Sequence, residues 1–175
     1  MIQSGKFDSL DMDIKKLANT SLIFITNRII EIIGIIISIL GILLLIALFS
    51  YSPSDPNFIF SDNTEIKNLL GFQGSYVSDF LFQSLGLVSF LIPITYFFSG
   101  IRIFKKKEIF FLIKNTFYIV VYSTVGALFF SYFYSDAFNL YINGNGGFVG
   151  NYLDQTFLSS LILINQSIFY YFLIV

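Results

Sequence analysis

The chain has 175 residues, of which 55% are hydrophobic and only 12% are charged, whereas soluble domains carry about 25% charged residues. The apolar residues gather into blocks that approach or exceed the roughly 18 residues needed for a spanning helix, so this composition indicates an integral membrane protein. The sequence contains no cysteine and no histidine, which excludes disulfides, thiolate zinc sites and histidine-based acid–base chemistry.

Residues 1–28 predict a cytoplasmic tail, and residues 29–175 a transmembrane domain. The first twenty residues are polar and mixed in charge, without the apolar stretch that a signal peptide has near its start. From Ile29 to Phe49 only Glu31 is charged, and at about 1.5 Å per residue this segment crosses the roughly 30 Å of hydrocarbon. We therefore predict a first transmembrane helix over residues 29–50.

The sequence SYSPSDP at residues 50–56 ends this helix, because two prolines and small hydroxyl residues stop helices and favour turns. An outer loop is expected over residues 51–76 and a second transmembrane helix over residues 77–101. Pro93 lies inside that helix and predicts a kink, because its ring clashes with the carbonyl group of the residue four positions earlier. Such prolines are tolerated in membrane helices, and we interpret this one as a packing feature.

A basic turn from Arg102 to Glu108 leads into an uncharged segment that predicts a third transmembrane helix over residues 115–134. A second outer loop over residues 135–150 contains the turn-forming sequence NGNGG, and residues 152–164 predict a short interfacial or re-entrant helix. A fourth span is expected over residues 166–175, but its apolar end is too short to cross a bilayer alone. We expect either a truncated gene product or a longer protein cut at this point.

The charges predict that the N-terminus lies in the cytoplasm, because Lys and Arg collect on that side of membrane proteins. One side carries nine of these residues: Lys6, Lys15, Lys16, Arg28, Arg102, Lys105, Lys106, Lys107 and Lys114. On the other side, residues 52–76 and 135–156 carry one basic residue and five acidic ones: Lys67, Asp55, Asp62, Glu65, Asp136 and Asp154. With four spans the C-terminus also faces the cytoplasm.

Few residues could carry chemistry within the spans. The ionisable ones are Glu31 and Asp79, and both lie near helix ends, where hydration or pairing is a better interpretation than ion transport. Arg28 precedes Glu31 by three positions, a spacing that lets the two pair on one helical face. Small residues at helical spacing favour packing inside the bundle over a dimerisation face; they are Gly34 and Ser38, and Ser123, Ala127 and Ser131.

No catalytic, cofactor-binding or metal-binding residue is predicted. The sequence contains no G-x-x-x-x-G-K-[ST] phosphate loop, and no basic stripe with interleaved aromatic residues that would bind nucleic acid. The basic turn at Arg102–Lys107 could attract anionic lipid, although its role as a topology signal explains it fully.

Three stretches of the sequence together carry a family resemblance. They are LFSYSPSDP at residues 48–56, GFQGSYVSDFLFQSLG at residues 71–86 and GGFVG at residues 146–150. In order and spacing the chain resembles the N-terminal membrane domain of the FtsK/SpoIIIE-type DNA translocases. The SYSPSDP core is the most specific of the three stretches, whereas the glycine patterns alone would be weak.

The resemblance implies a four-span, multi-pass anchor in the bacterial inner membrane, at the division septum. In that family the anchor holds a cytoplasmic hexameric ATPase that pumps chromosomal DNA, and it helps to recruit division proteins. The linker, the ATPase with its ATP and Mg, and the DNA-reading winged-helix domain lie beyond the fourth span. The resemblance therefore transfers no catalytic residue to this chain, and it implies that the chain is not itself an enzyme.

Other interpretations remain open at this stage. A small transporter or channel subunit would need polar or charged residues near the middle of the spans, where this sequence has Ile, Leu, Phe and Val. A membrane-embedded enzyme would need paired carboxylates, His or Cys at one depth. The SYSPSDP loop could form a rigid outer platform for a division partner, but a sharp helix stop followed by a turn is the better interpretation.

Overall fold

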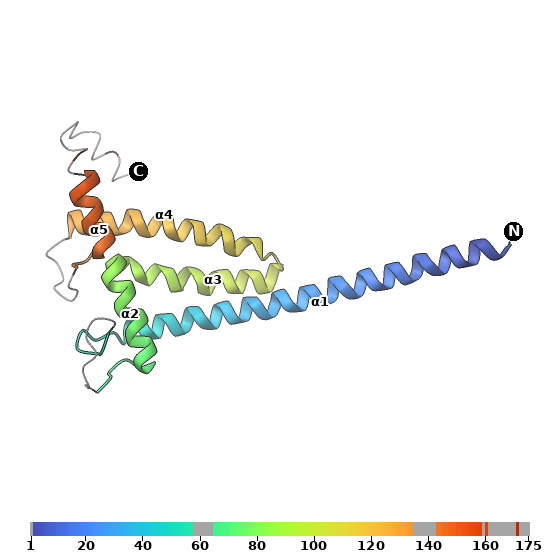
Figure 1. Ribbon diagram of the computed structural model, residues 1–175, viewed down its shortest axis with the longest axis horizontal. Helices are drawn as coiled ribbons and strands as arrows, with labels where there is room; N and C mark the ends of the chain where they lie inside the picture. Colours follow the sequence, from blue (N-terminus) through green and yellow to red (C-terminus); the bar gives the residue numbers. More distant parts are fainter. Residues whose placement is uncertain (1, 58–64, 135–142, 159, 161–170, 172–175) are drawn as a thin grey trace.

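The computed structural model describes residues 2–57, 65–134, 143–158, 160 and 171, with only the backbone described for residues 2–14. Within these residues every regular element is helical (Figure 1). Three segments are long and apolar enough to cross a membrane: Lys15–Phe49, Gly71–Lys106 and Phe110–Phe133. The predicted fourth span falls almost entirely outside the described residues.

The first helix, α1, runs without a break from Ile2 to Phe49. Its 48 residues correspond to about 72 Å, more than twice the hydrocarbon thickness of a bilayer. Only its C-terminal half packs against the rest of the bundle, and the N-terminal half projects away from it (Figure 1). The predicted tail and the predicted first span therefore form one continuous helix.

The second membrane segment is broken into two helices that run in different directions. Helix α2 spans Gly71–Leu85, a 3₁₀ turn η1 spans Gly86–Phe90, and helix α3 spans Leu91–Lys106. Figure 1 shows α3 running alongside α1, whereas α2 crosses the ends of the bundle. The continuous helix predicted over residues 77–101 is thus divided at Gly86.

The kink predicted at Pro93 is wrong in its position, because the break lies earlier, in η1. Pro93 is the third residue of α3, and the amide groups of a first helical turn have no partner within the helix. A proline there gives up no helical hydrogen bond. The Ser89 hydroxyl instead spans the break and donates to the carbonyl oxygen of Leu81 at 2.8 Å.

Helix α4, Phe110–Phe133, returns beside α3, and the chain then re-enters the described region at residue 143. Helix α5, Gly147–Leu153, continues into a single π-helical turn η2, Asp154–Leu158. Like α2, α5 crosses the end of the bundle (Figure 1). The short helix predicted over residues 152–164 is present in its first part, but it begins earlier, at Gly147.

Small residues allow α1 and α3 to approach closely. A Cβ atom added to Gly34 would lie 2.7 Å from the backbone nitrogen of Phe104, and one added to Gly41 would lie 2.8 Å from that of Phe97. The Ser38 hydroxyl donates to the carbonyl oxygen of Phe97 at 3.2 Å. Gly100 faces Ser38 from the other side of the contact. The pair Gly34 and Ser38 therefore serves packing inside the bundle, as its spacing indicated.

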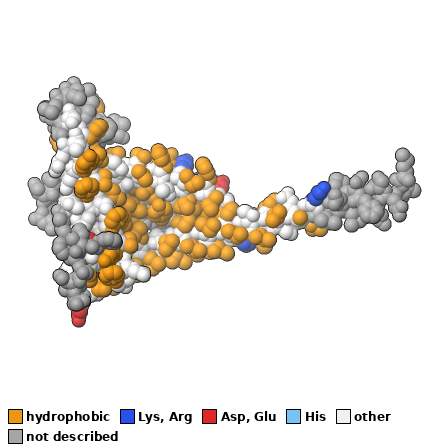
Figure 2. All heavy atoms as spheres, in the orientation of Figure 1, with side chains coloured by type: hydrophobic (Ala, Val, Ile, Leu, Met, Phe, Trp, Pro, Cys, Tyr) orange, Lys and Arg blue, Asp and Glu red, His pale blue; other side chains and the backbone are white. Residues whose placement is uncertain are grey.

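Apolar side chains cover the surface of α1, α3 and α4 in the view of Figure 2. The buried face of α4 consists largely of small residues, with Ser123, Ala127 and Ser131 each at most 4% exposed. Large exposed residues point outward from the same helices, among them Phe98 at 62% and Phe117 at 67%. Small residues inside and large apolar ones outside are typical of helices that pack together in lipid.

Candidate functional site

The chain's polar groups gather at the end of the bundle where α1 ends, α2 and α5 cross, and α4 ends, which is the end that the charge pattern predicts to face outward. Eleven polar or charged residues are buried among those described, and most of them belong to this region. We call it the outer cap and define it by residues 50–57, 65–90 and 143–158. Each buried polar group there should have a partner, because an unpaired one costs free energy in an apolar environment.

Asp55 anchors the entry to α2. Its side chain is 4% exposed, and its two carboxylate oxygens accept hydrogen bonds from the backbone amides of Lys67 at 3.0 Å and Asn68 at 2.8 Å. The carbonyl of Pro56 accepts from the Ser75 hydroxyl at 2.7 Å. The SYSPSDP segment therefore folds back on the bundle and ties α1 to α2. This arrangement supports the interpretation of a helix stop and turn, although Pro53 itself is exposed.

Asn68 links three segments from a buried position. Its amide nitrogen donates to the carbonyl of Ala47 in α1 at 2.9 Å, and its amide oxygen accepts from the backbone amide of Leu70 at 3.1 Å. The Ala47 carbonyl belongs to the last turn of α1, where carbonyl groups have no partner within the helix. Asn68 thus satisfies the end of one helix and the approach to the next.

Asp79, the acidic residue singled out in the second span, is paired at the outer cap. It is 8% exposed, and one of its carboxylate oxygens accepts from the Tyr51 hydroxyl at 3.0 Å. The Tyr51 ring packs on Phe82 with 4.9 Å between centroids, and Phe82 packs on Phe90 at 5.4 Å. The carboxylate therefore holds an aromatic cluster at the outer end, far from the middle of the spans.

Asn145 joins the second half of the cap to the break between α2 and α3. Its backbone carbonyl accepts from the amide of Leu87 at 2.9 Å, and its side chain donates to the carbonyl of Tyr134. Asn143 donates to the carbonyl of Gln83 at 3.2 Å. The backbones meet so closely that a Cβ atom on Gly86 would lie 1.8 Å from the Asn145 carbonyl oxygen. Only glycine fits at that contact.

Polar side chains also tie α5 to α4. The Ser131 hydroxyl donates to the side-chain oxygen of Asn151 at 2.7 Å, and the Asn151 amide donates to the carbonyl of Asn143 at 2.7 Å. Burial raises the pKa of the nearby Asp154 carboxyl above its ordinary value, because desolvation disfavours the charged form. The stripe of Ser123, Ala127 and Ser131 is thus used inside the chain, and Gly150 packs on the Ala127 carbonyl.

The opposite, inner end of the bundle carries a charged cluster. Glu31 accepts a hydrogen bond from Arg28, as the three-residue spacing indicated, and it also pairs with Lys107 at 3.1 Å. The Arg102 guanidinium lies 3.6 Å from the centre of the Phe111 ring. Lys107 has a left-handed backbone, with φ of 60°, at the turn between α3 and α4. The start of the membrane segment and the basic turn therefore share one end of the bundle.

The contacts described above position helices relative to one another. Among the described residues, no three His, Cys, Asp or Glu side chains lie close enough to hold a metal ion. Both acidic residues of the spans, Glu31 and Asp79, have partners at opposite ends of the bundle. Sequence reasoning singled out these two but missed Asn68 and Asn145. Both asparagines precede, by two or three positions, the glycine that begins a helix, and this pattern was the signal by which the sequence could have indicated them.

The family model for the 4TM region of DNA translocase FtsK/SpoIIIE matches residues 26–175 of the chain. The chain is 38% identical to the DNA translocase FtsK of Rickettsia prowazekii over 82 residues, which cover 45% of the chain and 11% of that relative. It is 36% identical to the FtsK of Rickettsia bellii over 84 residues, covering 48% of the chain and 11% of the relative.

A longer match joins the chain to the DNA translocase FtsK of Shewanella oneidensis, with 30% identity over 130 residues, 71% of the chain and 14% of the relative. No solved structure matches the chain. The matches thus span only about a tenth of the curated relatives, and the region matched by the family model is the membrane region rather than the motor. The chain belongs to the FtsK/SpoIIIE family of DNA translocases and comprises its 4TM membrane region.

Proposed function

We propose that this chain is the membrane anchor of an FtsK-type DNA translocase, seated in the bacterial inner membrane and directed to the division septum. The observation that carries the proposal is the match of residues 26–175 to the 4TM region of this family. The described contacts support it, because they join helices to one another and leave the outer surface of the spans apolar. Such a module supplies attachment and orientation for a motor located elsewhere.

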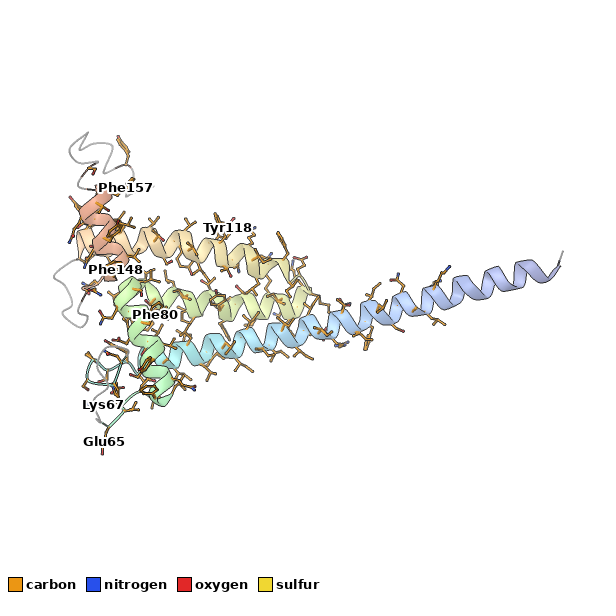
Figure 3. The ribbon with its side chains drawn as sticks, viewed as in Figure 1. Glu65, Lys67, Phe80, Tyr118, Phe148 and Phe157 are labelled. Atoms are coloured by element: carbon orange, nitrogen blue, oxygen red, sulfur yellow. The ribbon has the colours of Figure 1, made fainter. Side chains whose placement is uncertain are left out.

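The charged cluster at the inner end supports a cytoplasmic N-terminus. Arg28, Lys107 and the other basic residues of the turn between α3 and α4 lie at the end from which α1 projects (Figure 1). The loop that contains Glu65 and Lys67 lies at the opposite end (Figure 3). Positive charge on the cytoplasmic side would place the projecting N-terminal half of α1 in the compartment that holds DNA and ATP.

The partners of the whole translocase are inferred from membership of the family alone. We propose that the full translocase assembles as a hexamer, contacts division proteins through its membrane region, and reaches DNA only through a cytoplasmic motor domain. ATP and Mg would bind in that domain. The anchor itself would contact the lipid bilayer and neighbouring membrane helices.

Orientation can be tested directly because the chain has no cysteine. Single substitutions Glu65→Cys and Lys106→Cys place a thiol at either end of the bundle, and both positions are exposed. A membrane-impermeant maleimide applied to spheroplasts should label Glu65→Cys alone, whereas disrupted cells should label both. Labelling of Lys106→Cys in intact spheroplasts would contradict the proposed orientation.

The septal role requires the complete translocase in dividing cells. A fluorescent protein fused to its N-terminus should gather at the septum, and it should spread around the membrane when an unrelated four-span domain replaces this chain. The matched control keeps this chain and carries an inactivated motor, and it should still gather at the septum. Septal signal that survives the replacement would show that targeting lies outside this region.

A further inference from the structure

The outer cap contains the same short sequence twice. Residues 71–76 read GFQGSY and residues 147–152 read GFVGNY, so glycine, phenylalanine, glycine and tyrosine occupy equivalent positions. Each copy begins a helix, α2 in the first case and α5 in the second. Each also follows a helix that runs the length of the bundle, α1 or α4 (Figure 1).

The two copies have the same local geometry. Gly71 and Gly147 have φ values of 65° and 63°. Each backbone amide donates to the carbonyl three residues earlier, Gly71 to Asn68 at 2.9 Å and Gly147 to Gly144 at 3.2 Å. Within each copy the two aromatic rings are neighbours. Their centroids are 4.3 Å apart for Phe72 and Tyr76 and 6.0 Å apart for Phe148 and Tyr152. The repeat is therefore structural as well as sequential.

Helix α2 exposes an apolar face and buries a largely polar one. In α2, Phe72, Val77 and Phe80 are 49%, 45% and 67% exposed. The buried face of the same helix consists of Gly74, Ser75, Ser78, Asp79 and Phe82. A helix at a water-facing surface shows the opposite pattern. The exposed face of α2 thus has the chemistry of a surface in contact with lipid.

The second copy also exposes aromatic residues at its start. Phe148 and Tyr152 are 61% and 57% exposed, whereas Gly147 and Gly150 are buried. Further along, Leu158 is fully buried, as is its equivalent in the first copy, Phe82. We define the aromatic stripe by its exposed or half-exposed rings, which are Phe72, Tyr76, Phe80, Phe148 and Tyr152. None of these five residues is charged.

In the first copy the aromatic stripe adjoins the apolar surface of the spans. Beneath α2 lies a groove lined by Leu44, Tyr76, Val77, Phe80, Leu81 and Ile92, which joins the stripe to the outer surfaces of α1 and α3. On the side of the water, Glu65 and Lys67 mark the loop that precedes α2 (Figure 3). In the same view Phe80 lies on α2 between that loop and α3, and Phe148 lies on α5 beside the end of α4.

We propose that α2 and α5 are two copies of one interfacial unit, whose aromatic stripe inserts into the boundary between headgroups and acyl chains of the outer leaflet. Its partner is therefore lipid rather than a protein domain. Tyr and Trp are enriched at that boundary, and a helix lying in its plane buries Phe, Trp or Leu side chains on its apolar face. In the first copy the following span, α3, is fully described, and Phe72 and Phe80 remain 49% and 67% exposed.

The two units would set the depth of the bundle. Helix α2 has 15 residues, about 22 Å, and it lies across the ends of α1 and α3 rather than alongside them (Figure 1). Hydrogen bonds of Asp55 and Asn68 hold α2 on one side, and those of Asn145 hold it on the other. The two helices would therefore lie at the same depth in the membrane. This inference depends on the membrane location of the chain but not on its role as a motor anchor.

The chain has no tryptophan, so a single introduced indole reports depth without background. The variants Phe72→Trp and Phe148→Trp sample the two copies, Phe98→Trp is the control on the lipid-facing side of α3, and Lys67→Trp is the water-facing control. Each is reconstituted in vesicles of phosphatidylethanolamine and phosphatidylglycerol. Some of the lipids carry bromine either near the glycerol or near the middle of the acyl chain, and iodide serves as the aqueous quencher.

We expect the indoles at positions 72 and 148 to be quenched more by shallow than by deep bromine and to be protected from iodide. The indole at position 98 should show the reverse order of the two bromines, and that at position 67 should respond to iodide alone. Each variant must keep the circular dichroism spectrum of the parent chain. This measurement succeeds or fails regardless of septal targeting, so it separates the inference from the proposed function.

Three results would overturn the proposal. Quenching by iodide without bromine quenching at positions 72 and 148 would place the stripe in water, free for a soluble partner. Protection from both quenchers, relieved when the vesicles are diluted with lipid, would show that a second copy of the chain covers it. A lipid response at only one of the two positions would refute the equivalence of the two units.

Discussion

The substitution Gly147→Ala tests how α5 is held against the break between α2 and α3. Gly147 has a φ of 63°, and a Cβ atom there would lie 2.6 Å from the backbone of Ser84 and of Leu85. Backbone atoms cannot rotate away as a side chain can, so the two segments must separate. The hydrogen bond from Leu87 to Asn145 joins the same two segments and would be lost with them.

The expected cost has two parts. A positive φ costs alanine about 1–2 kcal/mol relative to glycine, and losing a buried backbone hydrogen bond costs about 1–3 kcal/mol. Gly147→Ala should therefore lower the free energy of unfolding by about 2–5 kcal/mol. The matched control is Gly71→Ala, at the equivalent position of the first copy. It has a φ of 65° and no heavy atom within 4 Å of the added Cβ, so it carries only the first cost.

Unfolding can be followed in mixed micelles by titrating dodecyl sulfate into dodecyl maltoside. The reporter is Ser123→Cys, a near-isosteric thiol at a position 4% exposed in α4, whose reaction with a maleimide reports opening of the bundle. The midpoint should fall slightly for Gly71→Ala and much further for Gly147→Ala. Equal midpoints for the two variants would refute the reasoning, because the close backbone contact would then contribute nothing.

Three further substitutions can be measured by the same titration. Asp55→Ala should cost about 1.5–3 kcal/mol, because two backbone amides lose a charged acceptor, whereas Glu65→Ala, exposed in the same loop, should stay within about 0.5 kcal/mol. Gly34→Leu should cost at least about 1–3 kcal/mol by forcing α1 from α3, while Ile35→Leu on the exposed face should have little effect. Tyr51→Phe should cost about 1.5–3 kcal/mol through the hydrogen bond to a buried carboxylate. A large effect of Glu65→Ala or Ile35→Leu would contradict these assignments. So would the absence of any effect of the three tested substitutions.

Much of the architecture could be predicted from composition and charge. The apolar run from Ile29 to Phe49 is long enough to cross the bilayer once, and a single segment can do so only as a helix. The structure contains that helix. The charge asymmetry assigned the start of the first span and the basic turn to one end of the bundle, where Glu31 meets Lys107. The pairing of Arg28 with Glu31 followed from helical spacing alone.

Other features could not be predicted because they depend on which segments meet in space. The break at Gly86 replaced the kink expected at Pro93 because the backbone of Asn145 approaches there, from a segment some sixty positions away in the chain. The local sequence shows the stronger helix breaker, proline. It does not show the tertiary contact that decides where the helix is interrupted. For the same reason α2 looked like part of a span, although its polar face is buried by the SYSPSDP loop.

The sequence by itself determined that the chain is helical and lies in a membrane, and which of its ends carries the positive charge, because hydrophobic length and charge act locally. Only the tertiary structure decided the roles of Asp55, Asn68 and Asn145, since a polar side chain near an interface can face water or satisfy a distant backbone group. It also decided that the two GFxGxY helices expose their aromatic residues. The pattern of a helix shows that it has two faces, but only the packing of its neighbours determines which face is buried.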